Sequence, residues 1–183
     1  MRLLLDHATQ MFKPKRGVSV TTQSIRRIWV YFLVNHIYTG TRAWNRKNTL
    51  LRAIGWKIGK GTKIVGPVAC FGKIEIGEEC WIGRNFSVHG NGLVIIDDHC
   101  DIAPEVAFFT GGHVIGGAER RAGEGETYTI RIGKGCWLGA RSSFLRNISI
   151  GDSCVVAACA CVTNSVEPNT LVGGVPAHVV RTL

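Results

Sequence analysis

The stretch KIEIGEECWIGRNFSV, residues 73–88, has an aliphatic residue at every sixth position, at Ile76, Ile82 and Val88. The same spacing continues on both sides, with a slip of two residues after Val88 and one interval of 24 residues that keeps the six-residue phase. Because helices and ordinary strands have periods of about 3.6 and 2 residues, a period of six predicts a parallel β-helix built from six-residue repeats. The members of the series, here called lead residues, are Ile58, Ile64, Cys70, Ile76, Ile82, Val88, Ile96, Ile102, Phe108, Ile132, Leu138, Phe144, Ile150, Val156 and Val162.

Three sides of six residues make one coil of a triangular prism, so each lead residue points inward and stacks on the lead residue one coil earlier. Gly or Ala often follows a lead residue, as at Gly77 and Gly83, and we expect these glycines to supply a positive φ at the corners. A single coil cannot bury its inner face, so stacking supplies the stability. The expected inner columns are Ile58, Ile76, Ile96, Ile132 and Ile150; then Ile64, Ile82, Ile102, Leu138 and Val156; and finally Cys70, Val88, Phe108, Phe144 and Val162.

The chain divides into three regions. Residues 1–57 form a basic and partly helical N-terminal region, residues 58–167 form the β-helix that carries the catalytic residues, and residues 168–183 form a C-terminal cap. Within the β-helix, residues 114–131 lack the repeat and are polar and rich in glycine. We expect them to form an external loop, because long loops without the pattern of their surroundings are often functional.

The positive charge is concentrated at the N-terminal end. Residues 1–60 contain twelve of the 22 Lys and Arg residues, and Asp6 is their single acid. Such a segment either forms a solvated face or binds an anionic partner or a membrane surface. The chain lacks the alternation of aromatic and basic residues that is typical of nucleic-acid binding. The apolar stretch 28–38 is shorter than the about 20 residues of a membrane span, so we expect a helix packed on the prism or on a neighbouring subunit, with peripheral membrane contact as an alternative. No signal-peptide pattern is present, which predicts a cytoplasmic location.

Four of the seven cysteines are regularly placed. Cys80, Cys100, Cys136 and Cys154 each stand four residues after a lead isoleucine on one side of the prism. Zinc ligands converge on a point, whereas these residues lie along a line. We therefore expect a column of small packed side chains and no metal site. Cys159 and Cys161 fall at outward positions.

His113 is the histidine with the most informative position. It ends the segment FFTGGH, residues 108–113, directly before the interval without repeats, and two glycines leave the backbone before it open to close approach. Imidazole titrates near neutral pH and can take a proton from a hydroxyl. The residues alone also allow an exposed histidine at the edge of a loop.

Four segments together carry a family resemblance: IAPEVAFFTGGH (102–113), IRIGKGCWLGA (130–140), ISIGDSCVVAACACVTNSV (148–166) and PNTLVGGVPAHVVR (168–181). In this order they resemble the hexapeptide-repeat acyltransferases of the sugar O-acetyltransferase branch, which includes the galactoside and maltose enzymes. The resemblance implies a left-handed parallel β-helix, a homotrimer, and acetyl-CoA bound between subunits as the acyl donor.

The resemblance also implies roles for individual residues. His113 is the general base, and the backbone N–H of Ala140 meets the developing oxyanion. The positions that match the family's contacts with coenzyme A are Trp137, Gly139, Ala140, Ala158, Thr163 and Arg181. The family's asparagine near the catalytic histidine aligns roughly with His89, and Asn91 follows two residues later; both are expected to bind the substrate.

The chain departs from the family pattern at several places. Asn164 and His178 replace residues that are often basic, which weakens two contacts with the donor phosphates. The segment around His89 is shorter than in the sugar enzymes, so galactoside and maltose are not carried over as acceptors. The N-terminal region is more similar to the branch that acetylates capsular, exopolysaccharide or O-antigen sugars.

These observations predict an acetyl-CoA-dependent O-acetyltransferase that acts on a sugar hydroxyl in polysaccharide or glycan biosynthesis. An N-acetyltransferase for an amino sugar or another amine is the main alternative, followed by a trimeric scaffold without catalysis. A γ-type carbonic anhydrase on the same prism needs three histidine ligands, two of them close in sequence. The spacings of ten and fourteen residues between His89, His99 and His113 do not meet that pattern.

Overall fold

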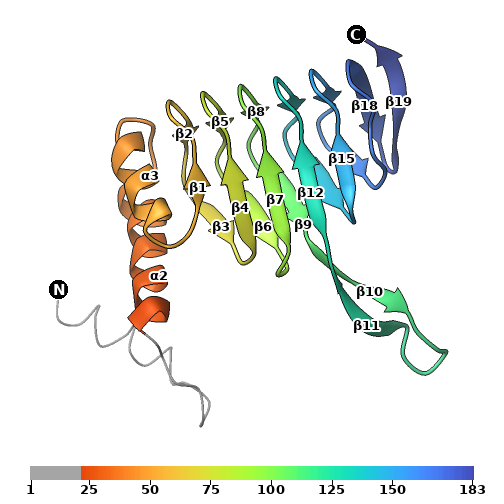
Figure 1. The fold of residues 1–183 in the computed structure, drawn as a ribbon, viewed down its shortest axis with the longest axis horizontal. Coiled ribbons are helices and arrows are strands. Elements are labelled where there is room, and N and C mark those ends of the chain that lie inside the picture. The colour runs from red at the N-terminus through yellow and green to blue at the C-terminus, as the bar shows by residue number, and fades with distance from the viewer. Residues whose placement is uncertain (1–21) are drawn as a thin grey trace.

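The computed structural model describes residues 22–183 as a solenoid with two short helices at one end (Figure 1). Residues 1–21, which include Asp6 and much of the predicted basic N-terminal region, lie outside the described part. The strands form three long sheets, one for each side of the expected prism.

Neighbouring strands in each sheet come from successive coils. The first sheet has the order β1 (Lys57–Ile58), β4 (Lys73–Ile76), β7 (Leu93–Ile96), β12 (Thr129–Ile132) and β15 (Ile148–Ile150). The second sheet has the order β2 (Lys63–Ile64), β5 (Trp81–Ile82), β8 (Asp101–Ile102), β13 (Trp137–Leu138), β16 (Val155–Val156), β18 (Thr170–Gly174) and β19 (Ala177–Thr182). The third sheet has the order β3 (Val68–Cys70), β6 (Phe86–His89), β9 (Ala107–Phe109), β14 (Ser143–Leu145) and β17 (Cys161–Val162).

The strand register confirms the three predicted columns of lead residues. Ile76 pairs with Ile58 and Ile96, Leu138 pairs with Ile102 and Val156, and Phe108 pairs with Val88 and Phe144. All lead residues are buried, and the rings of Phe108 and Phe144 stack with their centroids 4.9 Å apart. The parallel pairing ends at β18, which forms an antiparallel hairpin with β19 and so closes the C-terminal end.

The prediction that glycine after a lead residue supplies a positive φ was wrong. Gly83 has no positive φ; a Cβ there would lie 2.6 Å from the backbone nitrogen of Pro104 in the next coil, so close coil packing requires glycine. Positive φ occurs instead three residues after a lead residue, as at Glu79, Asn85 and His99. The backbone turns there, where a side chain can point into solvent.

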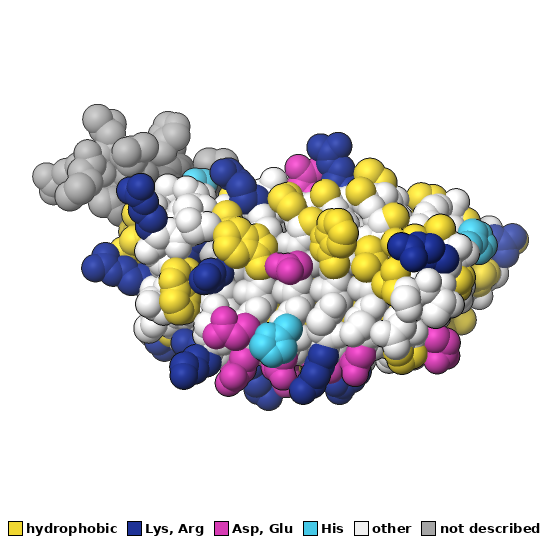
Figure 2. Space-filling model, turned by 90° about the horizontal axis from the view of Figure 1, so that it is seen from above, with side chains coloured by type: hydrophobic (Ala, Val, Ile, Leu, Met, Phe, Trp, Pro, Cys, Tyr) yellow, Lys and Arg dark blue, Asp and Glu magenta, His cyan; other side chains and the backbone are white. Residues whose placement is uncertain are grey.

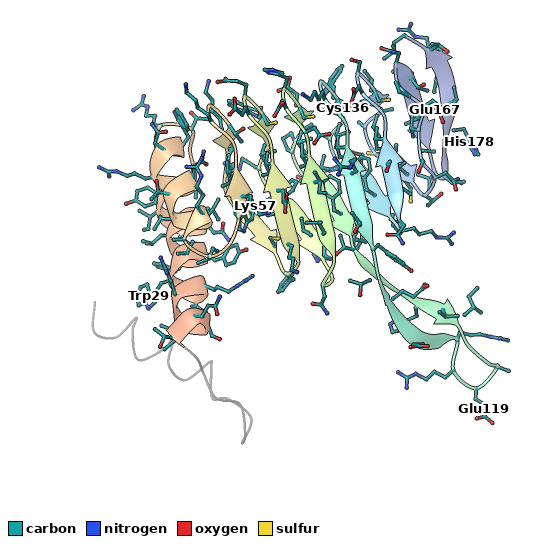
Figure 3. All side chains as sticks on the ribbon, in the orientation of Figure 1. Trp29, Lys57, Glu119, Cys136, Glu167 and His178 are labelled. Carbon is teal, nitrogen blue, oxygen red and sulfur yellow. The ribbon has the colours of Figure 1, made fainter. Side chains whose placement is uncertain are left out.

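Cys80, Cys100, Cys136 and Cys154 are buried and form the predicted packed column. Each thiol donates a hydrogen bond to a carbonyl oxygen of the next coil, for example Cys80 to Asp97 at 3.2 Å and Cys136 to Gly151 at 3.1 Å. Hydrogen bonds with Cys136 and Cys80, together with burial, raise the pKa of Cys100. Cys136 lies among the coils in Figure 3, and no cluster of His, Cys, Asp or Glu in residues 22–183 has the arrangement of a metal site.

Helices cover the open N-terminal end of the prism, as predicted for the apolar stretch. They are α2 (Thr22–Phe32), a π-helical continuation η1 (Leu33–Ile37) and α3 (Trp44–Arg52). The side chain of Asn35 pairs with both backbone groups of Val68, and Tyr31 donates a hydrogen bond of 2.9 Å to the carbonyl of Cys70. These contacts give hydrogen-bond partners to the backbone groups of Val68 and Cys70 at the edge of β3. Over the described residues, no helix has the length and apolar character needed to cross a membrane.

The predicted external loop is a β-hairpin with different limits. Strands β10 (Gly111–Ile115) and β11 (Ala122–Thr127) pair in antiparallel fashion and project from the solenoid between β9 and β12 (Figure 1). The predicted loop, residues 114–131, therefore begins after the start of the hairpin at Gly111 and ends after the end of the hairpin at Thr127. Residues 129–131 belong to β12, because Ile130 is a second inward residue two positions before the lead Ile132.

Candidate active site

The base of the hairpin is fixed on the solenoid by the buried Thr110. Its backbone N–H and its hydroxyl both donate to the carbonyl of His89, at 2.7 and 2.8 Å. The hydroxyl also accepts from the N–H of Gly92 at 3.1 Å, and the Thr110 carbonyl accepts from the N–H of Tyr128 at 2.8 Å. These bonds tie together the coils that carry His89, Asn91 and the hairpin, so the groups around His113 are held in place.

His113 lies on β10 with an exposed side chain. Its Nδ1 atom is 2.9 Å from the carbonyl oxygen of Gly123 on β11. Because a carbonyl oxygen only accepts, Nδ1 carries the proton and Nε2 presents its lone pair. A neutral imidazole in this tautomer can act as a general base through Nε2.

Two open depressions lie beside His113. The first has a volume of about 450 Å³ and is lined by Gly90, Asn91, Gly111, Gly112, His113, Gly125, Glu126 and Thr127. The second has a volume of about 570 Å³ and is lined by Phe109, Gly111, Gly112, His113, Val114, Ile115, Glu126, Tyr128, Leu145, Arg146 and Asn147. Asn91 and His113 therefore line the same depression.

Glycine keeps the space around His113 open. A Cβ at Gly112 would lie 2.9 Å from the ring of Tyr128, so a larger residue would displace that ring. The hydroxyl of Tyr128 donates to the Glu126 carboxylate at 2.9 Å, and this hydrogen bond raises the pKa of Tyr128. Both side chains line the second depression, where they offer polar groups to a ligand.

His89 lies next to this site and not in either depression. Its ring stacks between Phe71 and Phe109, with centroids 6.2 and 5.1 Å away, and its Nε2 is 3.1 Å from the hydroxyl of Ser87. Phe109, on which the His89 ring stacks, lines the second depression.

Sequence reasoning missed Phe109, Leu145, Arg146 and Asn147 as lining residues. Phe109 and Leu145 each follow a lead residue of the third column, at an outward position. A large apolar residue at an outward position is a signal in the sequence that could have identified both residues.

The residues expected to bind the donor lie on another part of the chain. Trp137 is 57% exposed on β13, Ala158 and Arg181 are exposed, and Thr163 is half-buried after β17. Gly139 is buried, and a Cβ there would lie 2.5 Å from the backbone nitrogen of Ala158, so coil packing alone requires this glycine. None of the six lines a depression that contains His113.

Ala140 is suited to bind an oxyanion. Its carbonyl accepts a hydrogen bond of 2.9 Å from the N–H of Cys159 in the next coil. Its own N–H has no acceptor among residues 22–183. The two departures from the family pattern, Asn164 and His178, are exposed, and His178 projects outward from β19 (Figure 3).

Comparison with known proteins finds a matching family model and several similar proteins. A family model described as bacterial transferase hexapeptide (six repeats) matches residues 129–164. The chain is 30% identical over 143 residues to the galactoside O-acetyltransferase of Escherichia coli K12, covering 74% of this chain and 68% of that protein. The chain belongs to the hexapeptide-repeat acyltransferases.

Among the hexapeptide-repeat acyltransferases, the relatives point to the sugar O-acetyltransferase branch. A putative colanic acid biosynthesis acetyltransferase, WcaF of Escherichia coli K12, is 32% identical over 137 residues, which is 72% of each chain. A hexapeptide-repeat acetyltransferase from Vibrio cholerae O1 biovar eltor, solved in complex with acetyl coenzyme A, superposes with a TM-score of 0.77 at 27% identity. The superposition covers 96% of this chain and 97% of that one. The predicted left-handed parallel β-helix is thereby confirmed.

Proposed function

We propose that this acetyl-CoA-dependent acetyltransferase moves the acetyl group to a sugar hydroxyl in polysaccharide or glycan biosynthesis, with His113 as the general base. The observation that carries the proposal is the hydrogen bond between Nδ1 of His113 and the Gly123 carbonyl, which leaves Nε2 free beside two open depressions. The relatives named for galactoside and colanic acid acetylation support a sugar acceptor.

The proposed reaction is direct transfer. The acceptor hydroxyl donates to Nε2 of His113, and its proton moves to Nε2 as the oxygen attacks the thioester carbonyl. The Gly123 carbonyl stabilises the imidazolium that forms, and the Ala140 N–H stabilises the oxyanion of the tetrahedral intermediate. Collapse of the intermediate breaks the carbon–sulfur bond, and the leaving thiolate takes the proton from His113. No acyl-enzyme forms, so the buried cysteines have no part in catalysis.

We also propose a homotrimer, because the proposed base and the main proposed donor contacts lie on different parts of a single chain. His113 lies on the hairpin that follows the third sheet, whereas Trp137 and Arg181 lie on the second sheet. Ile115 on the hairpin is 84% exposed, and Val179 on β19 is 69% exposed. From above, hydrophobic side chains form a band along the solenoid, and most charged ones gather toward one edge (Figure 2). Exposed apolar surface of this kind favours contact with another subunit.

Within the trimer, the donor would lie between subunits. Trp137 offers an exposed ring to the pantetheine arm, Gly139, Ala158 and Thr163 offer backbone and small side chains, and Arg181 offers charge to phosphate. His89 and Asn91 would contact the acceptor, Asn91 directly in the first depression.

The N-terminal helix supports contact with a membrane surface. The side chains of Ile25, Ile28, Trp29 and Phe32 form an exposed apolar stripe on α2, and Trp29 points away from the solenoid (Figure 3). Arg26 lies beside this stripe, as in helices that bind anionic interfaces. A cytoplasmic location is also proposed, and seven free thiols are consistent with a reducing compartment.

An amine acceptor is the second candidate, because the Glu126 carboxylate lines both depressions and would pair with an ammonium group.

The test is to incubate the enzyme with acetyl-CoA and a panel of neutral sugars, amino sugars and oligosaccharides, and to measure release of coenzyme A. Mild alkali removes an acetyl ester and leaves an amide intact. An alkali-labile product supports O-acetylation, and an alkali-stable one supports the amine alternative.

A further inference from the structure

A groove lies between the helices that cover the N-terminal end of the solenoid. It has a volume of about 370 Å³ and shares no lining residue with the two depressions at His113. One wall comes from η1 and the residue directly after it, and the other wall comes from α3. The lining residues of this feature, here called the helix groove, are Leu33, Tyr38, Asn45, Arg46, Thr49 and Leu50.

Both walls of the helix groove are fixed in place. Asn48 on α3 donates a hydrogen bond of 2.7 Å to the carbonyl of Thr62, and Asn35 of η1 pairs with the backbone of β3. The buried Lys47 on α3 donates to the carbonyl of Gly40, which lies in the connection between the two helices. A cavity whose walls are already ordered is typical of a ligand site, because little conformational freedom is lost on binding.

The lining of the helix groove combines a cation with apolar side chains. Arg46 is exposed and takes part in no ion pair within residues 22–183. A guanidinium group can donate two parallel hydrogen bonds to one phosphate group. Leu33 and Leu50 supply hydrocarbon surface from the two walls, and Tyr38 adds a phenol hydroxyl. The helix groove is therefore suited to a ligand that is anionic at one end and apolar at the other.

The charge around the helix groove is positive. Residues 22–56 contain six Lys and Arg residues and neither Asp nor Glu. Lys and Arg side chains surround the helical end of the molecule, next to the grey atoms in Figure 2. Such a region attracts anions and repels ligands with a free ammonium group.

The helix groove adjoins the exposed apolar stripe of α2. Leu33 stands one helical turn after Trp29 and next to Phe32 in the chain, so the stripe and the groove are neighbours on the helix surface. The rings of Trp29 and Phe32 meet edge to face with centroids 6.0 Å apart. A helix of this kind lies at the boundary between the lipid headgroups and the acyl chains. A stripe placed there brings the groove to the level of the lipid phosphates.

We propose that the helix groove binds one anionic phospholipid of a membrane, with Arg46 on its phosphate group and Leu33 and Leu50 against the adjoining hydrocarbon. This inference rests on the membrane contact proposed above and specifies the lipid group that is recognised. The stripe of α2 supplies apolar attachment to any bilayer, whereas the groove makes the attachment depend on a lipid whose headgroup has a net negative charge.

The helix groove is tested first with a single lipid in solution. Dihexanoyl phosphatidylglycerol is added below its micelle concentration, and native mass spectrometry counts the bound molecules. We expect one lipid per chain, with affinity lowered about tenfold in Arg46→Gln, since a hydrogen bond to a charged group is lost. Thr49→Trp should weaken binding as much, because it keeps the charge and fills the groove from an exposed position on α3.

Arg84→Gln is the matched control, because it removes the same charge from an exposed arginine of the solenoid, and it should bind lipid like the wild type. Inorganic phosphate at the same concentration should not compete with the lipid. Competition by phosphate would identify a general anion site and overturn the inference. Absence of lipid binding, equal binding by all variants, or a changed oligomer mass in Arg46→Gln would overturn it as well.

Vesicles provide the second test, with co-sedimentation on phosphatidylcholine alone or mixed with phosphatidylglycerol. The wild type should sediment better with the mixed vesicles, and Arg46→Gln and Thr49→Trp should lose this preference while Arg84→Gln keeps it. A preference retained by Arg46→Gln and Thr49→Trp overturns the helix groove and leaves the stripe as the membrane contact. A wild type that sediments with neither vesicle contradicts both. These measurements need no turnover, so an enzyme that transfers acetyl groups to no sugar would contradict the proposed reaction and not the helix groove.

Discussion

At the scale of single residues, the site depends on which nitrogen of His113 carries the proton. The Gly123 carbonyl holds the proton on Nδ1, and this contact exists only because β11 folds back along β10. Position and tautomer are thus set by the backbone of the hairpin, not by a neighbouring carboxylate.

The substitution His113→Ala should lower kcat by about 10²–10⁴-fold, which is the usual contribution of a positioned general base. Binding of acetyl-CoA, measured by calorimetry, should persist, because His113 takes part in proton transfer. His99→Asn is the matched control, since His99 is exposed, has φ of 59° and can be replaced by Asn without strain. Turnover by the Ala variant equal to that of the wild type would contradict the assignment.

At the corners between strands, glycine is required by contact between coils. Gly83→Ala should destabilise the protein by about 1–3 kcal/mol, because the new methyl group meets the backbone of Ala103 and Pro104. Gly117→Ala, at a position with open space around it, should have little effect. Urea denaturation of both variants measures the difference, and equal stability would show that the coils can move apart without cost.

At the scale of elements, the hairpin is the part of the fold that the repeat does not dictate. It carries His113 and Glu126, and it projects from the solenoid (Figure 1). Its tip and its base can be separated experimentally, because Gly123 and His113 lie away from the turn at residues 117–120.

Replacing residues 117–120 by a two-residue Gly-Asn turn should raise the KM of the acceptor and leave the KM of acetyl-CoA unchanged. The reason is that a loop beside the base can set specificity through its polar groups. Light scattering must show that the trimer persists. Unchanged acceptor KM and kcat in an intact trimer would exclude the hairpin tip from the acceptor site.

The apolar stripe of α2 leads to a separate prediction. Trp29→Ser should reduce co-sedimentation of the protein with vesicles that contain anionic lipid, because Trp29 is 51% exposed in the centre of the stripe. Val175→Ser, which removes an exposed apolar side chain from the opposite end of the solenoid, is the control. If wild type and Trp29→Ser sediment equally, the stripe does not bind membranes.

At the scale of the whole molecule, one chain presents the proposed base on the hairpin and the proposed donor contacts Trp137 and Arg181 on the second sheet. The expected mass in solution is three times the 20.0 kDa of one chain. A stable monomer at micromolar concentration would remove the basis for a site shared between subunits.

Mixed trimers test the shared site directly. His113→Ala and Trp137→Ala should each have low activity, and trimers assembled from both should regain part of it. Recovery is expected because some interfaces then combine an intact His113 from one subunit with an intact Trp137 from its neighbour. Native mass spectrometry confirms mixing, and mixed trimers without recovery would place both residues in a site within one chain.

The sequence by itself determined the β-helix, its three columns and the cysteine column. Lead residues such as Ile76 and Phe108 stack on identical positions one coil away, so a local period dictates a long-range contact. It also singled out His113, which stands directly before the interval without repeats, whereas Asn91 was named only through the family resemblance.

Only the tertiary structure decided how residues outside the repeat meet. The hairpin strands, the carbonyl of Gly123 at His113 and the outward rings of Phe71 and Phe109 depend on antiparallel pairing and on packing across coils. The corners show the same division. The sequence indicated glycine after the lead residue, but the reason is the backbone of the next coil, which lies close in space and eighteen or more residues away in the chain.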